Sequence, residues 1–587
     1  MSRNSSERSI LVVFGDSLPK KNKTWYRQFD KVIAPKNLQG KIQNQRIVFV
    51  DIETMVNPGS MQEANVLVNA LPDLTLDDGR KISKSVNWRG YELWWLHYED
   101  LMWKFCLPYT QYKELLLHLK DFDKIYLYQA SSPSLFQYFL GAHKRRCIIL
   151  KQFKLRDLLP IPFGIILQLL LSAAFLPVLK IKRPELMLWT SDKISPPYNF
   201  EFRNTSMYKE LIERRIPLAI FMRSLESWPK VLKNAWKRKR AVIYSSAIIE
   251  ALYLLGRPFN RFFVPMAASN EERRFWMSVA AHFLYNTRGT IWSIKTMQFL
   301  LRWLGVKAAI VPAACNRTFC EVLGCKLAGI KTVGIQHAAI PRHAFIADFM
   351  PGFDGENNIS LDKYGVWSEW WREYYLKYSQ AYKSSQLFVS GPCNPAEKEA
   401  VEVSRPAATG TSPLKVLFIS EQLAAPSEVM PYLLKLLETK DFKLSMKFRP
   451  YRDGFENWLM ENRPEILGRV KILKVSPQQA AAQSDVVVGS HSSAVLEGLL
   501  QQKPIFFFWT NKWGDYFDLK DLGAENRFFA LNPEELVEYI RGSANISQDL
   551  INKLQERFFG NPHKNGGKWV VDQAMDFAKE YENSSKI

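Results

Sequence analysis

The stretch that decides the fold is 484–506, which reads SDVVVGSHSSAVLEGLLQQKPIF. Its run of three valines predicts a strand buried on both faces, which ends at Gly489. A small polar turn follows, and a helix is expected to begin near Ser492 or Ser493. A second apolar run, Pro504–Trp509, predicts the next strand. A strand, a helix and a strand at this spacing are typical of a parallel α/β sheet.

The turn after Gly489 has the chemistry of a phosphate site. The first N–H groups of a helix have no partner inside the helix and lie at the positive end of its dipole, so they bind anions. Gly489 allows close approach to the backbone, and hydroxyl donors follow at Ser490, Ser492 and Ser493. Glu497, one turn into the helix, is placed to accept from a ribose hydroxyl. Ordinary capping by serine is the alternative, but ligands of parallel sheets bind at the carboxyl ends of the strands.

The same alternation of strands and helices divides the chain into regions. A doubly wound, Rossmann-like lobe is predicted at 414–575, with strands at Lys415–Ser420, Phe442–Phe448, Val470–Val475, Asp485–Gly489 and Pro504–Trp509. Another α/β unit is predicted at 306–395, with strands at Ala308–Pro312, Lys331–Gln336, Gly365–Trp367 and Gln386–Ser390. A polar stretch at 396–413 links the two units. Residues 1–155 are predicted to form an N-terminal α/β region, and 156–305 a helical region, because Trp, Arg and Leu recur there at helical spacing.

Two further segments follow predicted strands. In KFRPYR at 447–452, Lys447 and Arg449 are candidate charge partners for a diphosphate, and a solvated basic loop is the alternative. In GIQHAAIPRH at 334–343, His337 is a candidate general base, since an ordinary histidine pKa of about 6.5 suits removal of a hydroxyl proton. A structural histidine is the alternative there. Rival carboxylate bases stand at Asp348, Asp354 and Glu369.

Composition limits the partners. The 587 residues include 79 Lys or Arg against 58 Asp or Glu, so the net charge is +21 and anionic partners are favoured. Zinc spacing, an RNP-type pattern and a basic region with heptads are all missing, so nucleic acid is not expected. Six cysteines without a CxxC pair indicate a reducing compartment, and Cys315, Cys320 and Cys325 are interpreted as buried thiols. The DFD triplet at 121–123 precedes a strand and is interpreted as a solvated turn, so no metal is expected.

A segment without charge, LLPIPFGIILQLLLSAAFLPVL at 158–179, raises the question of membrane contact. Prolines at 160, 162 and 177 leave 163–176 as an unbroken helix of about 21 Å, shorter than the bilayer core of about 30 Å. Basic residues flank both sides, so we expect the segment to dip into one leaflet, with a buried core helix and a true span as alternatives. The cluster WKRKR at 236–240 is a candidate for the same surface. The chain is thus expected in the cytoplasm, peripheral on the inner face of the cytoplasmic membrane, with an anionic membrane surface as a partner.

The three motifs together resemble those of the GT-B glycosyltransferases. They are similar to the bacterial branch that acts on surface carbohydrates: capsule polysaccharide enzymes, Kdo and sialic acid transferases, and teichoic acid glycerophosphotransferases. That branch pairs a QHG- or WHG-type motif with a KxHP-type motif and a Ser/Thr-rich helix start that contains Glu. The corresponding segments here are 336–338, 447–450 and 490–497, with Ala338 in place of Gly and Arg449 in place of His. An arginine does not donate a proton in the ordinary pH range, so an acid role at 449 is in doubt.

The resemblance covers about 308–540 and implies a pair of Rossmann-type domains that face a cleft. The N-terminal α/β region and the helical, membrane-associated insert are expected from the sequence pattern alone. The resemblance implies transfer of a sugar from a nucleotide-activated donor to a cell-surface polysaccharide or a lipid-linked glycan, without metal or other cofactor. Donor phosphates would be held by Gly489, Ser490, Ser492, Ser493, Lys447 and Arg449, with Glu497 on the ribose or base and His337 as the base. A sugar-nucleotide epimerase on the same scaffold and a non-catalytic component of a polysaccharide assembly complex are the alternatives.

Overall fold

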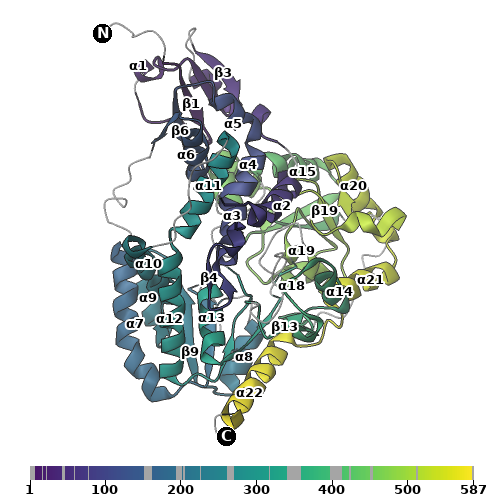
Figure 1. Ribbon diagram of the computed structural model, residues 1–587. Helices are drawn as coiled ribbons and strands as arrows, with labels where there is room; N and C mark the ends of the chain where they lie inside the picture. The colour runs from purple at the N-terminus through teal and green to yellow at the C-terminus, as the bar shows by residue number, and fades with distance from the viewer. Residues whose placement is uncertain are drawn as a thin grey trace.

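The computed structural model describes residues 7–584 apart from a set of gaps. The gaps are 16, 22, 42–46, 58–59, 77–78, 151–161, 193–200, 202–204, 225, 239, 261–269, 316, 337, 340–358, 397–412, 422–424, 450–453, 511–512 and 526. The described chain contains three parallel sheets surrounded by helices (Figure 1). The fold is therefore mixed α/β, as the sequence predicts.

The N-terminal sheet has the strand order β3-β2-β1-β6-β7 and lies beside the N-terminus (Figure 1). Its strands are β1 (Ser9–Val13), β2 (Lys31–Ala34), β3 (Val48–Asp51), β6 (Lys124–Tyr128) and β7 (Arg146–Leu150). All five residues of β1 are buried, as expected for a central parallel strand. Helix α6 (Pro133–Ala142) packs against α11 (Glu271–Leu284), so this region also recruits a segment from far along the chain.

The first lobe is built on a seven-stranded parallel sheet with the order β10-β9-β8-β11-β12-β13-β14. Its strands are β8 (Leu186–Ser191), β9 (Leu218–Arg223), β10 (Val242–Ile243), β11 (Ala308–Ile310), β12 (Lys331–Ile335), β13 (Lys363–Val366) and β14 (Leu387–Val389). Its helices include α7 (Pro162–Lys182), α8 (Thr205–Glu213), α9 (Trp228–Arg238), α10 (Ser245–Gly256), α12 (Thr287–Leu304), α13 (Phe319–Ala328) and α14 (Glu369–Tyr378).

The prediction that 156–305 is a helical region is incomplete, because this stretch supplies three strands of the first-lobe sheet. Strands β8 and β9 read LMLWTS and LAIFMR and are almost wholly buried. A short apolar run that is buried on both faces lacks the period-2 alternation of a half-exposed strand, and Leu and Met favour helices. Pattern alone therefore does not separate such a strand from a buried helix.

The second lobe holds a six-stranded parallel sheet with the order β17-β16-β15-β18-β19-β20. Its strands are β15 (Leu414–Ile419), β16 (Phe442–Lys447), β17 (Lys471–Ile472), β18 (Val486–Gly489), β19 (Ile505–Phe508) and β20 (Phe529–Ala530). The helices around it include α15 (Pro426–Glu438), α18 (Pro477–Ala482), α19 (Ser493–Leu500), α20 (Pro533–Arg541) and α21 (Gln548–Phe559). The order is doubly wound, as predicted from the sequence.

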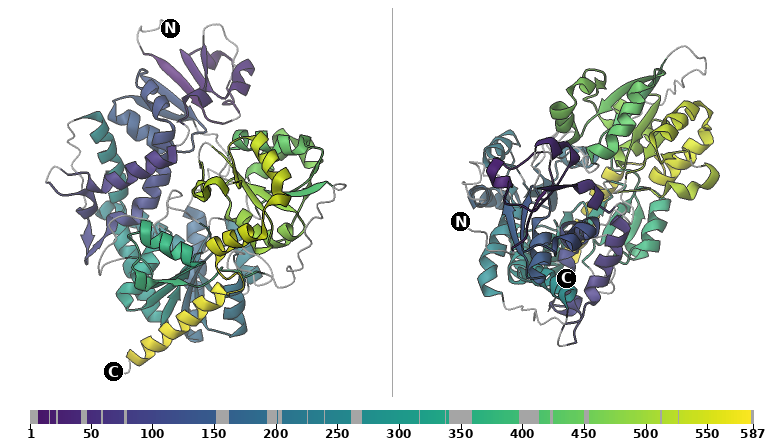
Figure 2. Two further views of the ribbon diagram at one scale, coloured as in Figure 1. Left: turned by 90° about the vertical axis from the view of Figure 1, so that its right-hand side faces the viewer. Right: turned by 90° about the horizontal axis from the view of Figure 1, so that it is seen from above.

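The C-terminal helix α22 (Gly566–Ser584) belongs to the first lobe, so the predicted boundary of the second lobe at 575 is wrong. It packs against α8, β11 and β12, and Figure 2 shows it leaving the second lobe and running beneath the first. A Cβ on Gly567 would meet the backbone N of Met207 at 2.5 Å, so only glycine allows this approach. Ion pairs Arg214–Asp572 (2.6 Å) and Lys331–Glu580 (2.6 Å) flank the contact.

Helix α7 continues through Pro177 to Lys182, which contradicts the predicted end at 176. A proline inside a helix removes one backbone hydrogen bond, and helices can continue past that loss. Pro177 lies on the exposed side of α7, away from the contacts that hold the helix to the first lobe. At 21 residues the helix is about 32 Å long.

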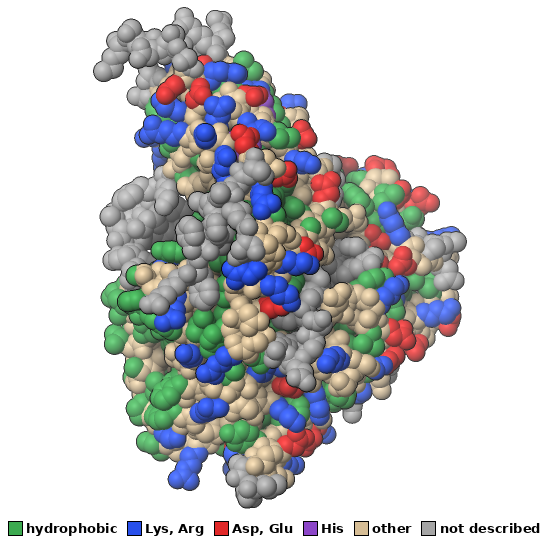
Figure 3. Space-filling view, viewed as in Figure 1, with side chains coloured by type: hydrophobic (Ala, Val, Ile, Leu, Met, Phe, Trp, Pro, Cys, Tyr) green, Lys and Arg blue, Asp and Glu red, His purple; other side chains and the backbone are tan. Residues whose placement is uncertain are grey.

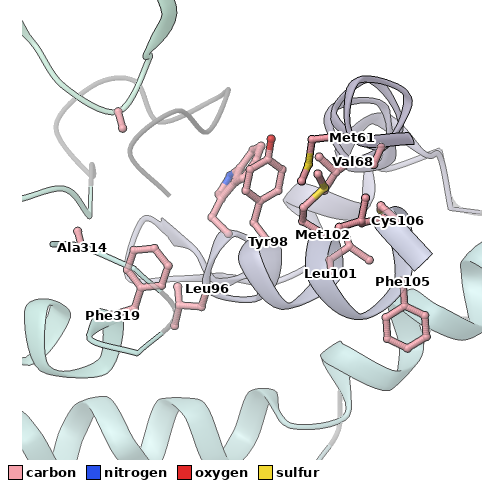
Figure 4. Close-up of a cluster of buried hydrophobic side chains, with 14 of the residues drawn as sticks. Met61, Val68, Leu96, Tyr98, Leu101, Met102, Phe105, Cys106, Ala314 and Phe319 are labelled. Atoms are coloured by element: carbon pink, nitrogen blue, oxygen red, sulfur yellow. The ribbon is translucent and has the colours of Figure 1, made fainter. Parts of the chain in front are cut away.

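A helical segment joins the N-terminal sheet to the first lobe. It comprises η5 (Leu93–His97), α3 (Tyr98–Leu101) and the π-helix η6 (Met102–Cys106). In Figure 4, Leu96 lies beside Ala314 and Phe319 of the first lobe, while Met102 lies beside Met61 of helix α2 (Ser60–Ala70). We call 93–106 the bridging segment.

Candidate functional site

The order in which the second-lobe strands follow one another reverses between β15 and β18. The turn after Gly489 lies at that point. Strand β15 is central: β16 and β17 lie on one side, and β18, β19 and β20 on the other. Ligands of such sheets bind outside the carboxyl ends of the strands where the order reverses. A Cβ on Gly489 would meet Val495 Cγ2 at 2.5 Å and the Ile419 carbonyl oxygen at 3.0 Å. The glycine therefore lets the turn lie directly on the end of β15.

Helix α19 starts from this turn as the sequence predicts. Ser492 is the N-cap, and its side chain accepts from the Ala494 N–H at 3.3 Å, while Ser493 is the first helical residue. Ser490 is 4% exposed and lies 2.9 Å from the ring Nδ1 of His491. A Cβ on Gly498 would meet Ile505 and Val487 side chains at 2.9 Å, so this glycine holds α19 tightly on the sheet. The three serines thus occupy one helix N-terminus, but Ser490 already bonds within the protein.

The two predicted cations lie at the end of β16. Lys447 is buried, and its Nζ donates to the Val475 carbonyl at 2.6 Å. Burial lowers the pKa of Lys447, and the carboxylate of Glu497 opposes that shift. Arg449 Nη1 lies 3.5 Å from Glu421 Oε1, and its side chain is 35% exposed. Arg449 is therefore the more accessible cation, and Lys447 is held among protein groups with Glu497.

An aromatic group at this edge was missed by the sequence analysis. The ring of His491 stacks on Trp513 with centroids 4.6 Å apart and lies 5.6 Å from Tyr516. His491 and Trp513 are 5% and 8% exposed. They are 22 positions apart, so no local pattern joins them, although a histidine inside the glycine–serine turn was a visible signal.

At the first-lobe edge, Gln336 follows β12 and fixes that strand to the end of β13. Its Oε1 accepts from the Trp367 backbone N–H at 3.2 Å, and its carbonyl accepts from the Trp367 indole N–H at 2.5 Å. The candidate base His337 lies outside the described residues, as do its rivals Asp348 and Asp354. The third rival, Glu369, begins α14 and pairs with Arg372 at 2.8 Å.

Buried ionisable groups also lie at the described part of the first-lobe edge. Asp192, after β8, pairs with Arg238 at 2.7 Å, and both side chains are 1% exposed. Glu321 in α13 accepts from Ser245 Oγ at 2.6 Å and from the Trp189 indole N–H at 3.2 Å. Burial raises the pKa of Glu321 to about 7. Arg238 belongs to the basic cluster 236–240 that was expected at a membrane surface, but it is buried against Asp192, so that expectation is wrong for this residue. The roles of Asp192 and Glu321 were not identified from the sequence, because their partners come from distant elements.

The bridging segment contacts both carboxyl edges. Glu99 lies 4.0 Å from Arg317, which follows β11 of the first lobe. Trp103 lies against Trp513 of the second lobe, with ring centroids 6.0 Å apart. Since one short segment reaches both edges, the two sheets present their carboxyl ends to a common region.

A cavity of about 250 Å³ lies between the lobes, where α14 meets η14 (Leu519–Glu525) and α21. Tyr374 donates to Asp518 at 3.2 Å, and the Arg557 guanidinium lies 4.5 Å from the centre of the Trp370 ring. Burial lowers the pKa of Arg557, against the pull of Asp521 and Asp518. The cavity combines aromatic faces with carboxylates, and the sequence analysis did not identify it.

Two sequence segments were considered as metal sites, the acidic triplet 121–123 and the three cysteines, and their side chains are engaged within the protein. Asp123 pairs with Arg145 at 3.0 Å and accepts from the Arg8 N–H at 2.9 Å. Cys315, Cys320 and Cys325 are free thiols whose pKa values are raised by burial. Among the residues that the structure describes, no group of three His, Cys, Asp or Glu is arranged to hold a metal ion.

Comparisons with known proteins give distant similarities only. No family model and no curated protein matches the chain. MurG from Acinetobacter baumannii is 12% identical over 67% of this chain and 99% of its own, with a TM-score of 0.40. A glycosyltransferase from Rickettsia africae is 12% identical over 68% of this chain and 98% of its own, at 0.39. A UDP-GlcNAc 2-epimerase from Neisseria meningitidis, solved with UDP-GlcNAc, is 11% identical over 67% and 99%, at 0.38. Scores this low do not establish a shared fold, so the description of two Rossmann-type lobes rests on the sheets of this chain.

Proposed function

We propose that the chain is a glycosyltransferase of the GT-B type. It moves a sugar from a nucleotide-activated donor to a cell-surface polysaccharide or a lipid-linked glycan. The observation that supports this most directly is the turn at Gly489, which lies on the end of β15 at the point where the second-lobe sheet reverses. The bridging segment adds support because it touches the carboxyl edges of both lobes.

In this proposal the donor phosphates bind at the N-terminus of α19. The N–H groups of the first turn, with the hydroxyls of Ser490, Ser492 and Ser493, donate to the phosphate oxygens. Arg449 supplies an accessible positive charge. Lys447 holds Glu497 by charge attraction, and that orients the carboxylate toward a ribose or base.

Transfer needs an acceptor base and stabilisation of the leaving group. The acceptor hydroxyl gives its proton to His337 while its oxygen bonds to the anomeric carbon, and the bond from that carbon to the donor phosphate breaks. The charge that develops on the leaving phosphate is stabilised by the dipole of α19 and by the cations, so these residues need no metal for this step. Full loss of turnover in His337→Ala with intact nucleotide binding is expected, and retained activity would exclude this base.

The binding half of the proposal is tested by thermal shift with CMP, CDP, UDP and GDP. A nucleotide that binds only the folded chain raises the melting temperature by mass action. Ser492→Ala removes an N-cap and should destabilise by about 1 kcal/mol. Ser476→Ala is the matched control, because Ser476 caps α18 of the same lobe through the Gln479 N–H at 3.1 Å.

The expected result is that both variants melt earlier and only Ser492→Ala loses the nucleotide-induced shift. Equal shifts in the two variants would place the nucleotide elsewhere. The nucleotide that raises the melting temperature most identifies the nucleobase of the donor. A sugar nucleotide with that nucleobase is then incubated with the chain in the absence of acceptor. Inversion at a sugar carbon would indicate an epimerase instead, and binding without any turnover on offered glycans would indicate a non-catalytic component of an assembly complex.

A further inference from the structure

Helix α7 exposes apolar side chains and buries its uncharged polar ones, which is the reverse of a helix on an aqueous surface. From 163 to 178 its exposed residues are apolar and follow the helical repeat, and the exposed Lys180 and Lys182 stand beside Ile181 in the last turn. The exposed apolar residues are Phe163, Ile166, Leu170, Ala173, Ala174, Pro177, Val178 and Ile181. Its polar residues Gln168 and Ser172 are 6% and 2% exposed. Only 17% of its apolar window is buried, so α7 is not the core helix of the alternative interpretation. A helix with this orientation has its apolar stripe where water would favour charges.

Neighbouring helices extend the apolar face. On α9, Trp228, Leu232 and Trp236 lie one turn apart and are 41%, 41% and 84% exposed. Trp228 meets Phe163 of α7 with ring centroids 5.7 Å apart, so the two stripes are continuous. Phe299 of α12 is 62% exposed, and Trp303 of α12 is joined to α7 by Lys180, which donates to the Trp303 carbonyl.

We call this surface of α7, α9 and α12 the apolar face; Figure 3 shows hydrophobic side chains gathered at that edge of the first lobe. An apolar surface that continues over three helices is larger than the single, scattered apolar residues found on ordinary protein surfaces.

The charges on the three helices of the apolar face have one sign. Helices α7, α9 and α12 contain no Asp or Glu, and neighbouring α10 contains one, Glu250. Exposed lysines and arginines alternate with the apolar residues, among them Lys180, Lys182, Lys233, Lys237, Arg288, Lys295 and Arg302. Along α12 the order Arg288, Trp292, Lys295, Phe299 and Trp303 places cations between aromatic rings on one side of the helix. Aromatic rings with basic neighbours are typical of groups that lie at the level of lipid headgroups.

Helix α7 is held in the first lobe by its polar side. Ser172 Oγ donates to the Gln168 carbonyl at 2.7 Å and accepts from the Tyr244 backbone N–H at 2.9 Å, just after β10. A transmembrane orientation would break these bonds and remove one layer from the sheet. The attached position favours a helix that lies in the plane of a membrane over one that crosses it.

We infer that the apolar face of α7, α9 and α12 docks on an anionic lipid bilayer, with α7 in the plane of the interface. The bilayer is preferred to a protein partner because the charged residues on α7, α9 and α12 are all positive, which complements phosphatidylglycerol or similar headgroups. This inference does not depend on the proposed enzymatic activity. It assigns the chain a peripheral position on a membrane with the first lobe toward the lipid.

The test is flotation of the full chain with vesicles of phosphatidylcholine, alone or with about one third phosphatidylglycerol. Wild type should float with the anionic vesicles and lose this binding as salt is raised. Ile166→Glu with Leu170→Glu should reduce binding at least about ten-fold, because both side chains are half or more exposed and would enter the acyl boundary. Val66→Glu on α2 is the control, since Val66 is 72% exposed and lies outside the apolar face.

A second pair of variants tests the charges. Lys233→Gln with Lys237→Gln should weaken anionic-vesicle binding roughly twenty-five-fold, at about five-fold per cation. Lys440→Gln with Lys443→Gln in the second lobe should leave binding unchanged. Light scattering of the same samples measures the oligomeric state, and so shows whether a second copy of the chain covers the apolar face instead of lipid.

Two results would overturn the inference. One is wild type that stays with the lipid-free fraction. The other is a stable dimer that Ile166→Glu with Leu170→Glu converts to monomer without any change in vesicle binding, which would show that a second copy covers this face.

Discussion

The two lobes share a doubly wound parallel sheet but use their carboxyl edges differently. At the second-lobe edge the chain places small residues and a helix N-terminus, with Gly489 against the end of β15. At the first-lobe edge it places large and ionisable side chains that bond to one another, such as Asp192 with Arg238 and Glu321 with Ser245. Topology supplies a carboxyl edge in both lobes, whereas the side chains decide how much of the described part of each edge is taken up by contacts within the protein.

The largest loss of stability is expected from breaking the buried Asp192–Arg238 pair of the first lobe. Asp192→Asn removes the charge partner of Arg238 while both side chains are 1% exposed, so an uncompensated guanidinium remains buried. We expect a loss of about 3–5 kcal/mol in the free energy of unfolding, measured by urea denaturation. Asp441→Asn, which breaks the exposed Arg541–Asp441 pair, should cost less than about 1 kcal/mol. Similar losses in the two variants would contradict a buried pair in which Arg238 depends on Asp192 for charge compensation.

A pH-dependent effect of the next size is expected at Glu321. Its pKa rises from 4.5 to about 7 on folding, so between these values the folded chain holds a proton that the unfolded chain has released. The free energy of unfolding therefore falls as pH rises through this window, and the penalty is complete above it. At about 1.4 kcal/mol per pKa unit, Glu321→Gln should gain roughly 3 kcal/mol over wild type at pH 8 and little at pH 4.5.

The measurement for Glu321 is urea denaturation of the variant and wild type at both pH values. The exposed Glu538→Gln serves as control and should show no pH-dependent difference from wild type. A constant difference between Glu321→Gln and wild type across the range would mean that the carboxyl is ionised throughout.

A smaller loss of stability is expected at the carboxyl edge of the second-lobe sheet. The added methyl of Gly489→Ala meets Val495 Cγ2 at 2.5 Å, and overpacking of this kind costs about 1–3 kcal/mol. The variant should also lose any nucleotide-induced rise in melting temperature, because the turn must move away from β15. Gly542→Ala, where no atom lies within 4 Å of the new methyl, should change neither quantity. A Gly489→Ala chain that melts and binds like wild type would mean that the close approach at β15 is unimportant.

The sequence predicts the second lobe better than the first. Strands β18 (Val486–Gly489) and β19 (Ile505–Phe508) fall within the predicted Asp485–Gly489 and Pro504–Trp509, because an apolar run bounded by small or polar residues marks the ends of a strand. Strands β8 and β9 were missed because Leu and Met in a doubly buried strand carry no periodic signal.

The candidate site divides in the same way. Local pattern finds the cap at Ser492, since the cap lies next to the helix that it begins. It does not find His491 on Trp513 or Glu321 beside Trp189, since these contacts join residues that only the fold brings together. The place of His337 stays a prediction, because it lies outside the described residues.

The return of α22 to the first lobe has a consequence for truncated chains. The second lobe lies in the sequence between β14 and α22, which both belong to the first lobe. The chain comes back through Gly560–Gly566, where Gly560 has a positive φ of 60° and lies against Trp367. Buried residues of α22, among them Val570 and Ala574, share one apolar core with strands β8 and β11. A chain cut after the second lobe would therefore expose the interior of the first.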